Sequence, residues 1–177
     1  MILAERTRLR AAERNDLLQF VLWLNDPEVR AGLEMFMPLS LTEEERWYEQ
    51  MLKAPSGEHV LVIEVKDPDA WRSIGTCGLH SIDWRSRSAE AGISIGEKNC
   101  WNRGYGTQVM RLLVQHGFDT LNLNRVYLKV YSNNLRAIRC YEKAGFVHEG
   151  RFRQAQYQDG QYFDILVMSM LRSEWVK

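Results

Sequence analysis

The segment 133–146 reads NNLRAIRCYEKAGF and decides the fold class of this chain. Five of its positions, at spacings of three, four and seven residues, fall on one stripe of a helix: Asn134, Ala137, Ile138, Tyr141 and Gly145. An amphipathic helix over 134–144, closed by a left-handed Gly145, explains the small and apolar members of this stripe. It does not explain an amide near the start and a phenol near the end, so Asn134 and Tyr141 are candidate functional residues.

A strand and a glycine-rich turn precede this helix. Alternating apolar residues predict a strand over 125–131. Further upstream, Gly104-Tyr105-Gly106-Thr107 stands before a helix expected over 104–120, and glycines at a helix N-terminus leave backbone N–H groups free to bind a phosphate. The turn matches neither the dinucleotide fingerprint, whose third glycine is replaced by Val109, nor the P-loop. A plain structural turn stays open as the alternative.

Two motifs together resemble the GNAT acetyltransferase superfamily. They are Trp101-Asn102-Arg103-Gly104-Tyr105-Gly106-Thr107 and, after one strand, Asn134-x-x-Ala137-x-x-x-Tyr141-x-Lys143-x-Gly145-Phe146. The chain is most similar to the branch of ribosomal-protein N-terminal acetyltransferases and spermidine acetyltransferases, and the similarity extends to Leu9-Arg10 and to residues 23–27. Trp101 stands where the family often has Gln or Arg, and Asn102 stands where it often has Gly.

The resemblance implies an α/β (α+β) fold of the GNAT type, a mixed, mostly antiparallel sheet flanked by helices. The strands Ala89–Ile95 and Arg125–Tyr131 are expected to splay apart, so that the pantetheine arm of acetyl-CoA lies between them. A backbone N–H of the strand leading to Ile95 is expected to polarise the thioester carbonyl, and Asn134 to hold the pantetheine or a water. The backbone that is expected to wrap the pyrophosphate is that of Asn102, Arg103, Gly104, Tyr105, Gly106 and Thr107.

The activity that the resemblance implies is direct attack of a primary amine on acetyl-CoA in a ternary complex, with no covalent enzyme intermediate. An amine with a pKa near 10 must lose a proton before attack, and a departing thiolate can take one from a phenol. Tyr141 is therefore the expected acid. Glu90 is preferred to Glu97 as the base, although two solvent-facing carboxylates are an equal alternative. Cys140 is not expected to be a nucleophile, because adjacent residues on a helix point about 100° apart.

The acceptor amine stays open between a small molecule and a protein N-terminus. Asp26, Glu28 and Glu34 form an acidic cluster that could receive a polycation such as spermidine, or could be a solvated loop. A non-catalytic acyl-CoA-binding module is the rival from another class, and the presence of Tyr141 speaks against it. A homodimer, built through the strand 163–171, is a further expectation.

The remaining patterns predict further helices, strands and core residues. Leucines at helical spacing after Asp16 predict a helix that stops before Pro27, and Thr42-Glu43-Glu44-Glu45 predicts a capping box. The buried stripe of that second helix is expected to contain Trp47, Met51 and Leu52. Strands are expected over 60–65, 73–79, 146–152 and 162–171, with a hairpin turn at Asp159-Gly160. Trp23, Trp47 and Phe118 are expected in the core.

Composition bounds the class of protein. The 177 residues predict one domain over 1–177, and 23 basic against 23 acidic residues give no net charge, which argues against a dedicated nucleic-acid binder. Three cysteines without a C-x-x-C pair predict a reducing, cytoplasmic location. The four histidines lack metal-ligand spacing, so no metal is expected, and no apolar stretch approaches a membrane span. Gly92-x-Ser94-x-Gly96 is not a hydrolase elbow, because Ser94 lies within a strand pattern rather than at a strand-to-helix turn.

Overall fold

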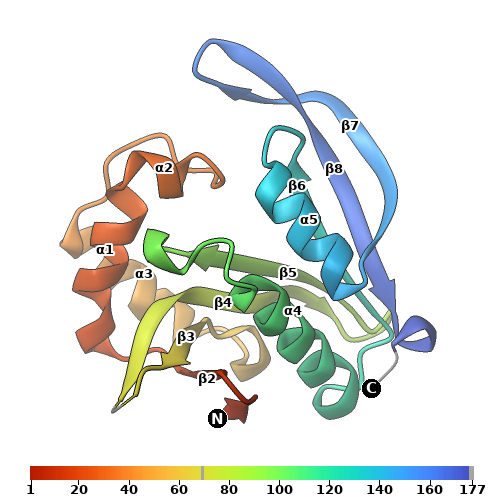
Figure 1. Ribbon diagram of the computed structural model, residues 1–177, viewed down its shortest axis with the longest axis horizontal. Helices are drawn as coiled ribbons and strands as arrows, with labels where there is room; N and C mark the ends of the chain where they lie inside the picture. The colour runs from red at the N-terminus through yellow and green to blue at the C-terminus, as the bar shows by residue number, and fades with distance from the viewer. Residues whose placement is uncertain (69, 176–177) are drawn as a thin grey trace.

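A computed structural model describes residues 1–68 and 70–175 (Figure 1). Its strands form one eight-stranded sheet in the order β1-β2-β3-β4-β5-β6-β8-β7. The strands are β1 (Ile2–Leu3), β2 (Thr7–Ala11), β3 (Leu61–Lys66), β4 (Trp71–Asp83), β5 (Ser88–Ile95), β6 (Arg125–Tyr131), β7 (Val147–Gln158) and β8 (Gln161–Leu171). Every neighbouring pair is antiparallel except β5 and β6, which run parallel. The expected mixed, mostly antiparallel sheet is confirmed.

Helices cover both faces of this sheet. They are α1 (Leu17–Asn25), α2 (Pro27–Arg30), α3 (Leu41–Met51), α4 (Tyr105–Gln115) and α5 (Leu135–Ala144). The main core lies between the sheet and the pair α4 and α5, where residues such as Ile63, Val109 and Leu128 are fully buried. A smaller cluster joins α1 and α3 to Val62, the neighbour of Ile63, because successive side chains of a strand point to opposite faces.

The parallel strands β5 and β6 pair over a short stretch and then separate. Ser88–Glu90 lies in register with Arg125–Tyr127, and no later residues of the two strands pair in the part of the chain that the structure describes. The expected splay is therefore confirmed, and it opens toward the C-terminal ends of both strands. α5 lies in front of β6 on one side of this opening (Figure 1).

The second long helix differs from its sequence-based description. α3 begins at Leu41, and its capping box pairs Ser40 with Glu43 rather than starting at Thr42. Its buried stripe is Glu44, Tyr48 and Met51, whereas Trp47 and Leu52 are 37% and 50% exposed. The stripe is set by Tyr48, whose hydroxyl donates to the Ala12 carbonyl at 3.3 Å. Among the expected core residues, Trp23 and Phe118 are confirmed as buried and Trp47 is wrong.

Three further expectations concern the helix over 104–120, the hairpin and the last strand. The helix expected over 104–120 is α-helical only to Gln115 and ends in the π-helical turn His116–Thr120, where Leu121 N donates to His116 O. The expected hairpin is confirmed: Asp159 and Gly160 have φ of 49° and 82°, as its turn requires. The strand 163–171 belongs to β8, which pairs with β6 and β7, so its backbone is not free to pair with a second copy.

Candidate active site

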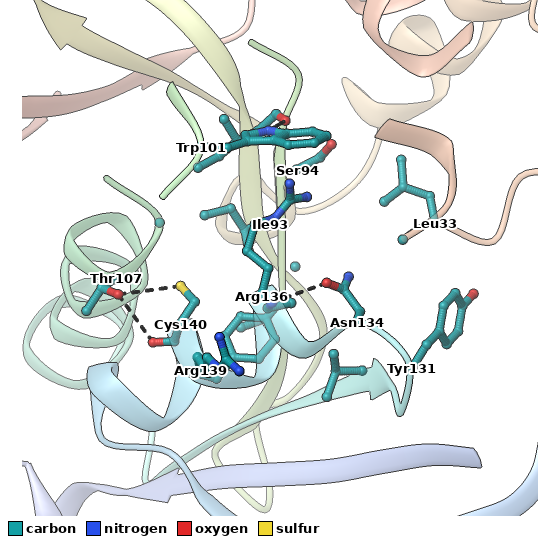
Figure 2. Close-up of a pocket in the computed structure, with 18 of the residues that line it drawn as sticks. Leu33, Ile93, Ser94, Trp101, Thr107, Tyr131, Asn134, Arg136, Arg139 and Cys140 are labelled. Carbon is teal, nitrogen blue, oxygen red and sulfur yellow. Dashed lines mark hydrogen bonds between the residues drawn. The ribbon is translucent and has the colours of Figure 1, made fainter. Parts of the chain in front are cut away.

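A cleft of about 740 Å³ opens where β5 and β6 separate (Figure 2). Both strands line it, together with the start of α4, one face of α5 and the segment after α2. Of the expected site residues, the lining includes Glu90, Ile95, Asn102, Gly104, Tyr105, Gly106, Thr107, Asn134 and Tyr141. Arg103 is exposed and is not part of the lining. The structure thus brings all but one of these residues to a single cavity.

The N-terminus of α4 is left open toward this cleft. Gly104 precedes the helix with φ of +82°, and no side chain caps the first turn. The first backbone bond of the helix runs from Gln108 N to Gly104 O, so the N–H groups of 105–107 have no partner among the described residues. Three orphan donors at the positive end of a helix dipole suit an anion such as a diphosphate.

Glycine also suits the second position of this turn, Gly106. A Cβ on Gly106 would come within 3.0 Å of Cys140 Sγ, so α4 and α5 approach closely here. The Thr107 hydroxyl donates to the Cys140 carbonyl at 3.4 Å, which fixes the two helices to each other (Figure 2). Burial raises the pKa of the Cys140 thiol, so this cysteine is not an activated nucleophile.

One face of α5 presents positive charge to the cleft. Arg136, Arg139 and Lys143 line it at spacings of three and four residues, and none of them forms an ion pair among the described residues. The guanidinium of Arg136 stacks 3.4 Å from the centre of the Trp101 ring. These three cations were not predicted as site residues, although their helical spacing is visible within the segment 133–146.

The side of β5 that faces the gap carries free backbone groups. Gly96 N donates to Ile74 O in β4, and backbone groups alternate in direction along a strand, so those of Ile93 and Ile95 point into the gap. The Ile95 carbonyl accepts a 2.7 Å hydrogen bond from Trp101 Nε1. The Ile95 N–H therefore remains available to a ligand.

Tyr141 is buried in the wall of the cleft. Its ring packs edge-on against Phe146, with 6.1 Å between centroids. Burial, the largest cause, raises the pKa of Tyr141 well above the usual value of a phenol. The group is therefore protonated at neutral pH and is equipped to give a proton rather than to take one.

Asn134 has a structural task that the sequence analysis did not foresee. Its side-chain oxygen accepts a 3.2 Å hydrogen bond from Ala137 N and thereby caps α5. This capping accounts for the amide at the start of the stripe. The amide nitrogen, Nδ2, faces Gly32 in the segment after α2, where an added Cβ would lie 2.9 Å away.

The two carboxylates proposed as bases lie in different places. Glu90 lines the cleft and accepts a 3.1 Å hydrogen bond from Lys129 Nζ. Glu97 accepts a 3.0 Å hydrogen bond from Trp23 Nε1 and lies in a separate hollow beside α1. Only Glu90 can therefore reach a substrate in the main cleft.

The three acidic residues expected as a cluster near α2 also lie in different places. Lys98 Nζ lies 2.8 Å from Asp26 and 2.9 Å from Glu28, and Asp26 also caps α2. Only Glu34 lines the cleft. The charge of Asp26 and Glu28 is thus compensated, and Glu34 is the member available to a cation.

Neither a metal cluster nor a membrane-spanning helix is found in the part of the chain that the structure describes. Within residues 1–68 and 70–175, no group of three or more His, Cys, Asp or Glu side chains is placed to hold a metal ion. Over the same ranges, none of the helices is both long and apolar enough to cross a membrane.

Residues 6–147 match the family model described as an acetyltransferase (GNAT) domain. The chain is 32% identical to an uncharacterized N-acetyltransferase, p20, of Bacillus licheniformis, over 97% of this chain and 96% of that protein. It is 34% identical to the putative ribosomal N-acetyltransferase YdaF of Bacillus subtilis (strain 168), over 57% and 55% of the two chains. Among solved structures, spermidine N-acetyltransferase from Vibrio cholerae in complex with CoA and spermine superposes with a TM-score of 0.86, at 28% identity, over 95% and 96% of the chains.

Proposed function

The chain belongs to the GNAT acetyltransferase family, and on that premise we propose that it acetylates a primary amine by direct attack on acetyl-CoA in a ternary complex. Membership makes it an N-acetyltransferase that uses acetyl-CoA. The single observation that carries the proposal is the uncapped N-terminus of α4, which opens into the cleft between the splayed strands.

The residues present fit the phosphates, the pantetheine arm and the thioester of acetyl-CoA. The amides of 105–107, with Asn102 and Gly104 beside them, would bind the pyrophosphate. The unpaired cations of α5 would bind the phosphate on the ribose, and exposed Arg103 would act from outside the cleft. The Ile95 N–H and Asn134 Nδ2 would hold the pantetheine arm and the thioester carbonyl. Acetyl-CoA supplies the activated acetyl group, and the chain supplies its position.

The proposed chemistry needs one base and one acid. Glu90 takes a proton from the acceptor ammonium, directly or through water, and the neutral nitrogen then attacks the thioester carbon. A C–N bond forms, the C–S bond breaks, and the thiolate takes the proton of the Tyr141 hydroxyl. The amide nitrogen loses its second proton to solvent, from which Tyr141 is reprotonated.

The Tyr141→Phe variant tests this assignment. We expect kcat to fall about 100-fold or more, because a positioned acid contributes roughly that factor, while CoA affinity changes little. Release of free thiol from acetyl-CoA measures turnover, and calorimetry measures CoA binding. Tyr157→Phe, on the exposed β7–β8 hairpin, is the matched control. Unchanged turnover in Tyr141→Phe would show that another group protonates the thiolate.

The acceptor is proposed to be spermidine or another small amine, with a protein N-terminus as the second candidate. The Vibrio cholerae structure holds spermine, and YdaF is named as a putative ribosomal N-acetyltransferase. Assays on polyamines, amino acids, aminoglycosides and N-terminal peptides distinguish the two. Tight CoA binding without turnover on any amine would instead support a non-catalytic binding module.

Three further proposals concern the protein as a whole. We place the catalytic unit over residues 1–177 as one domain, in the cytoplasm, where the three free cysteines would stay reduced. A homodimer remains a prediction, and light scattering of the purified protein measures it.

A further inference from the structure

Two glycines face each other across β4 and β5 in the middle of the sheet. Gly78 pairs with Gly92, and the next pair on the same face of the two strands is His80 with Glu90. Glycine weakens a strand interior, because it loses more conformational freedom on folding and offers no side chain to pack. A pair of glycines at this place therefore needs a structural reason, and the His80 ring supplies it.

The His80 imidazole lies against both glycines. An added Cβ on Gly78 would lie 3.0 Å from Cε1 of His80, and one on Gly92 would lie 3.3 Å from its Nε2. Glu90 and Gly92 line the cleft, as does Ser94 on the same side of β5 (Figure 2). The pairing of β5 with β6 ends at Glu90. The imidazole therefore lies against the wall of the cleft at the point where the two strands separate.

A β-bulge directly after His80 sets the direction of this side chain. The register of β4 and β5 shifts between His80 and Asp83, and Ser81 adopts φ of 52°, a strained conformation for a residue with a Cβ. Ile82 N, within the bulge, donates to Glu58 Oε1 at 3.2 Å. Bulges commonly re-aim a side chain beside an active site. The chain thus retains a strained residue and two glycines around one imidazole.

This imidazole is free to take up a proton. It is half-buried, and its ring nitrogens have no hydrogen-bond partner in the part of the chain that the structure describes. The charged groups that act on it are the carboxylates of Glu58, in the 3-10 helix Ser56–Glu58, and of Glu90, which is paired with Lys129. Burial, the largest cause, outweighs these carboxylates and lowers the pKa of His80 below its usual value. The ring is therefore neutral at pH 7.

We propose that His80 accepts, through a water molecule, the proton that Glu90 removes from the acceptor ammonium. This inference rests on the proposed function. Within the described residues, no hydrogen bond or ion pair joins the two side chains, so a water molecule is required between them. The ammonium becomes a neutral amine, Glu90 returns to its carboxylate form, and the imidazole becomes an imidazolium that releases the proton to solvent. His80 does not touch the substrate and acts only through Glu90.

A second proton acceptor improves the transfer for a simple reason. Carboxyl groups are much weaker bases than amines, so a proton held by a carboxyl alone returns readily to the amine. In model peptides, imidazole is a stronger base than a carboxylate by roughly two pKa units, and it is the side chain best matched to proton transfer near neutral pH. One oxygen of Glu90 already accepts a hydrogen bond from Lys129, and the other is left to pass the proton on.

The His80→Phe variant tests this role, because phenylalanine keeps a ring against the two glycines but cannot accept a proton. We expect kcat at about pH 8 to fall roughly tenfold or more, with KM for acetyl-CoA within about twofold. The ratio of wild-type to variant kcat is expected to shrink toward one below about pH 6, where the wild-type imidazole is already protonated. His148→Gln, at an exposed histidine that bonds to Glu142, is the matched control and leaves the pH profile unchanged.

An unchanged kcat in His80→Phe, or a ratio that is the same at every pH, would overturn the inference, because a ring that only packs has no pH dependence of its own. His80→Ala is the second variant, since it leaves room for free imidazole against the same glycines. Turnover that rises with added neutral imidazole supports the inference, and turnover indifferent to imidazole contradicts it.

NMR titration of the histidines tests the pair without turnover. Glu90→Gln should lower the pKa of His80, because it removes a carboxylate that favours the imidazolium. A His80 titration that is the same in wild type and Glu90→Gln would refute the pair and leave the proposed function standing. Absence of turnover with every amine would refute the proposed function, and the NMR titration would still decide whether His80 and Glu90 are coupled.

Discussion

The two helices that form the cofactor side of the cleft begin in opposite ways. At α5, the Asn134 side chain accepts a hydrogen bond from Ala137 N, so the chain completes its own first turn. At α4, Gly104 offers no side chain and adopts φ of +82°, and the first N–H groups stay open. The cap at α5 stabilises that helix but uses a donor that a ligand could have bound. The open terminus of α4 leaves its donors to a ligand but adds no capping stability to the helix. Where the first N–H groups of a helix have no partner in the chain, a ligand is expected to bind them.

A negative charge at the open terminus of α4 should weaken cofactor binding strongly. A Cβ on Gly104 meets nothing within 4 Å, so Gly104→Asp clashes with no neighbour, although it strains the backbone at φ of +82°, and it places a carboxylate beside the open amides. We expect CoA affinity to fall roughly 100-fold, about 2.7 kcal/mol, because the carboxylate repels the diphosphate. Isothermal titration calorimetry with CoA measures the change.

Gly104→Asn separates charge from backbone strain. It shares the positive φ, which costs about 1–2 kcal/mol of stability for a residue with a Cβ, but it has no negative charge. We expect it to keep most of the CoA affinity. Equal losses in Asp and Asn would contradict an anion site at α4 and would assign the effect to the backbone.

A third helix, α3, contains a capping glutamate, Glu43, next to a buried glutamate, Glu44, that does not cap the helix. Glu43 accepts hydrogen bonds from Ser40, which lower its pKa, whereas burial raises the pKa of Glu44, one residue later, to about 7. A carboxyl with a raised folded-state pKa favours folding below its unfolded pKa and loses that contribution as the pH rises to 7. Glu44→Gln should therefore raise the free energy of unfolding by about 1–2 kcal/mol at pH 8 and by much less at pH 5.

Denaturant unfolding at the two pH values measures this effect. Glu45→Gln, at the next position of the same helix, is the control. A Glu44→Gln variant that is equally stabilised at both pH values would show that its benefit does not come from removing a buried charge.

The smallest effects are expected at the capped terminus. Asn134→Ala should lower the free energy of unfolding by about 1 kcal/mol, whereas Asn134→Ser, which retains a capping oxygen, should change it little. Both variants lack Nδ2, so both should weaken CoA binding by about three- to tenfold, the loss of one neutral hydrogen bond. CoA affinity at the wild-type level in Asn134→Ser would restrict Asn134 to its capping role.

Local signals made much of the fold predictable. The stripe ending at Gly145, the hairpin at Asp159-Gly160 and the alternation over 125–131 each depend on neighbours in sequence, and each is confirmed. The splay followed from the family resemblance, because no local pattern shows where two strands stop pairing. Glycines at the start of α4 predicted free backbone amides there, whereas the position of these amides at the cleft needed the structure.

Other features depended on partners far away in sequence. Glu97 is withdrawn from the cleft by Trp23, 74 residues earlier, and no local pattern reports that contact. Trp47 is exposed because Tyr48 determines which face of α3 packs inward. The hydroxyl of Tyr131 lacks a partner only in the folded chain. The sequence shows which residue types are present and how they are spaced, whereas the direction in which each side chain points depends on contacts across the whole fold.

The separation of β5 and β6 also bears on pairing with strands of other molecules. Strands that part within a sheet expose unpaired amides and carbonyls, and such rows can recruit a foreign peptide. The Trp101 indole N–H donates a hydrogen bond to the Ile95 carbonyl, and the Arg136 guanidinium stacks on that indole ring. A polypeptide would need this carbonyl to continue the ladder. A strand that pairs with this edge of β5 would therefore have to compete with the Trp101 indole for the Ile95 carbonyl.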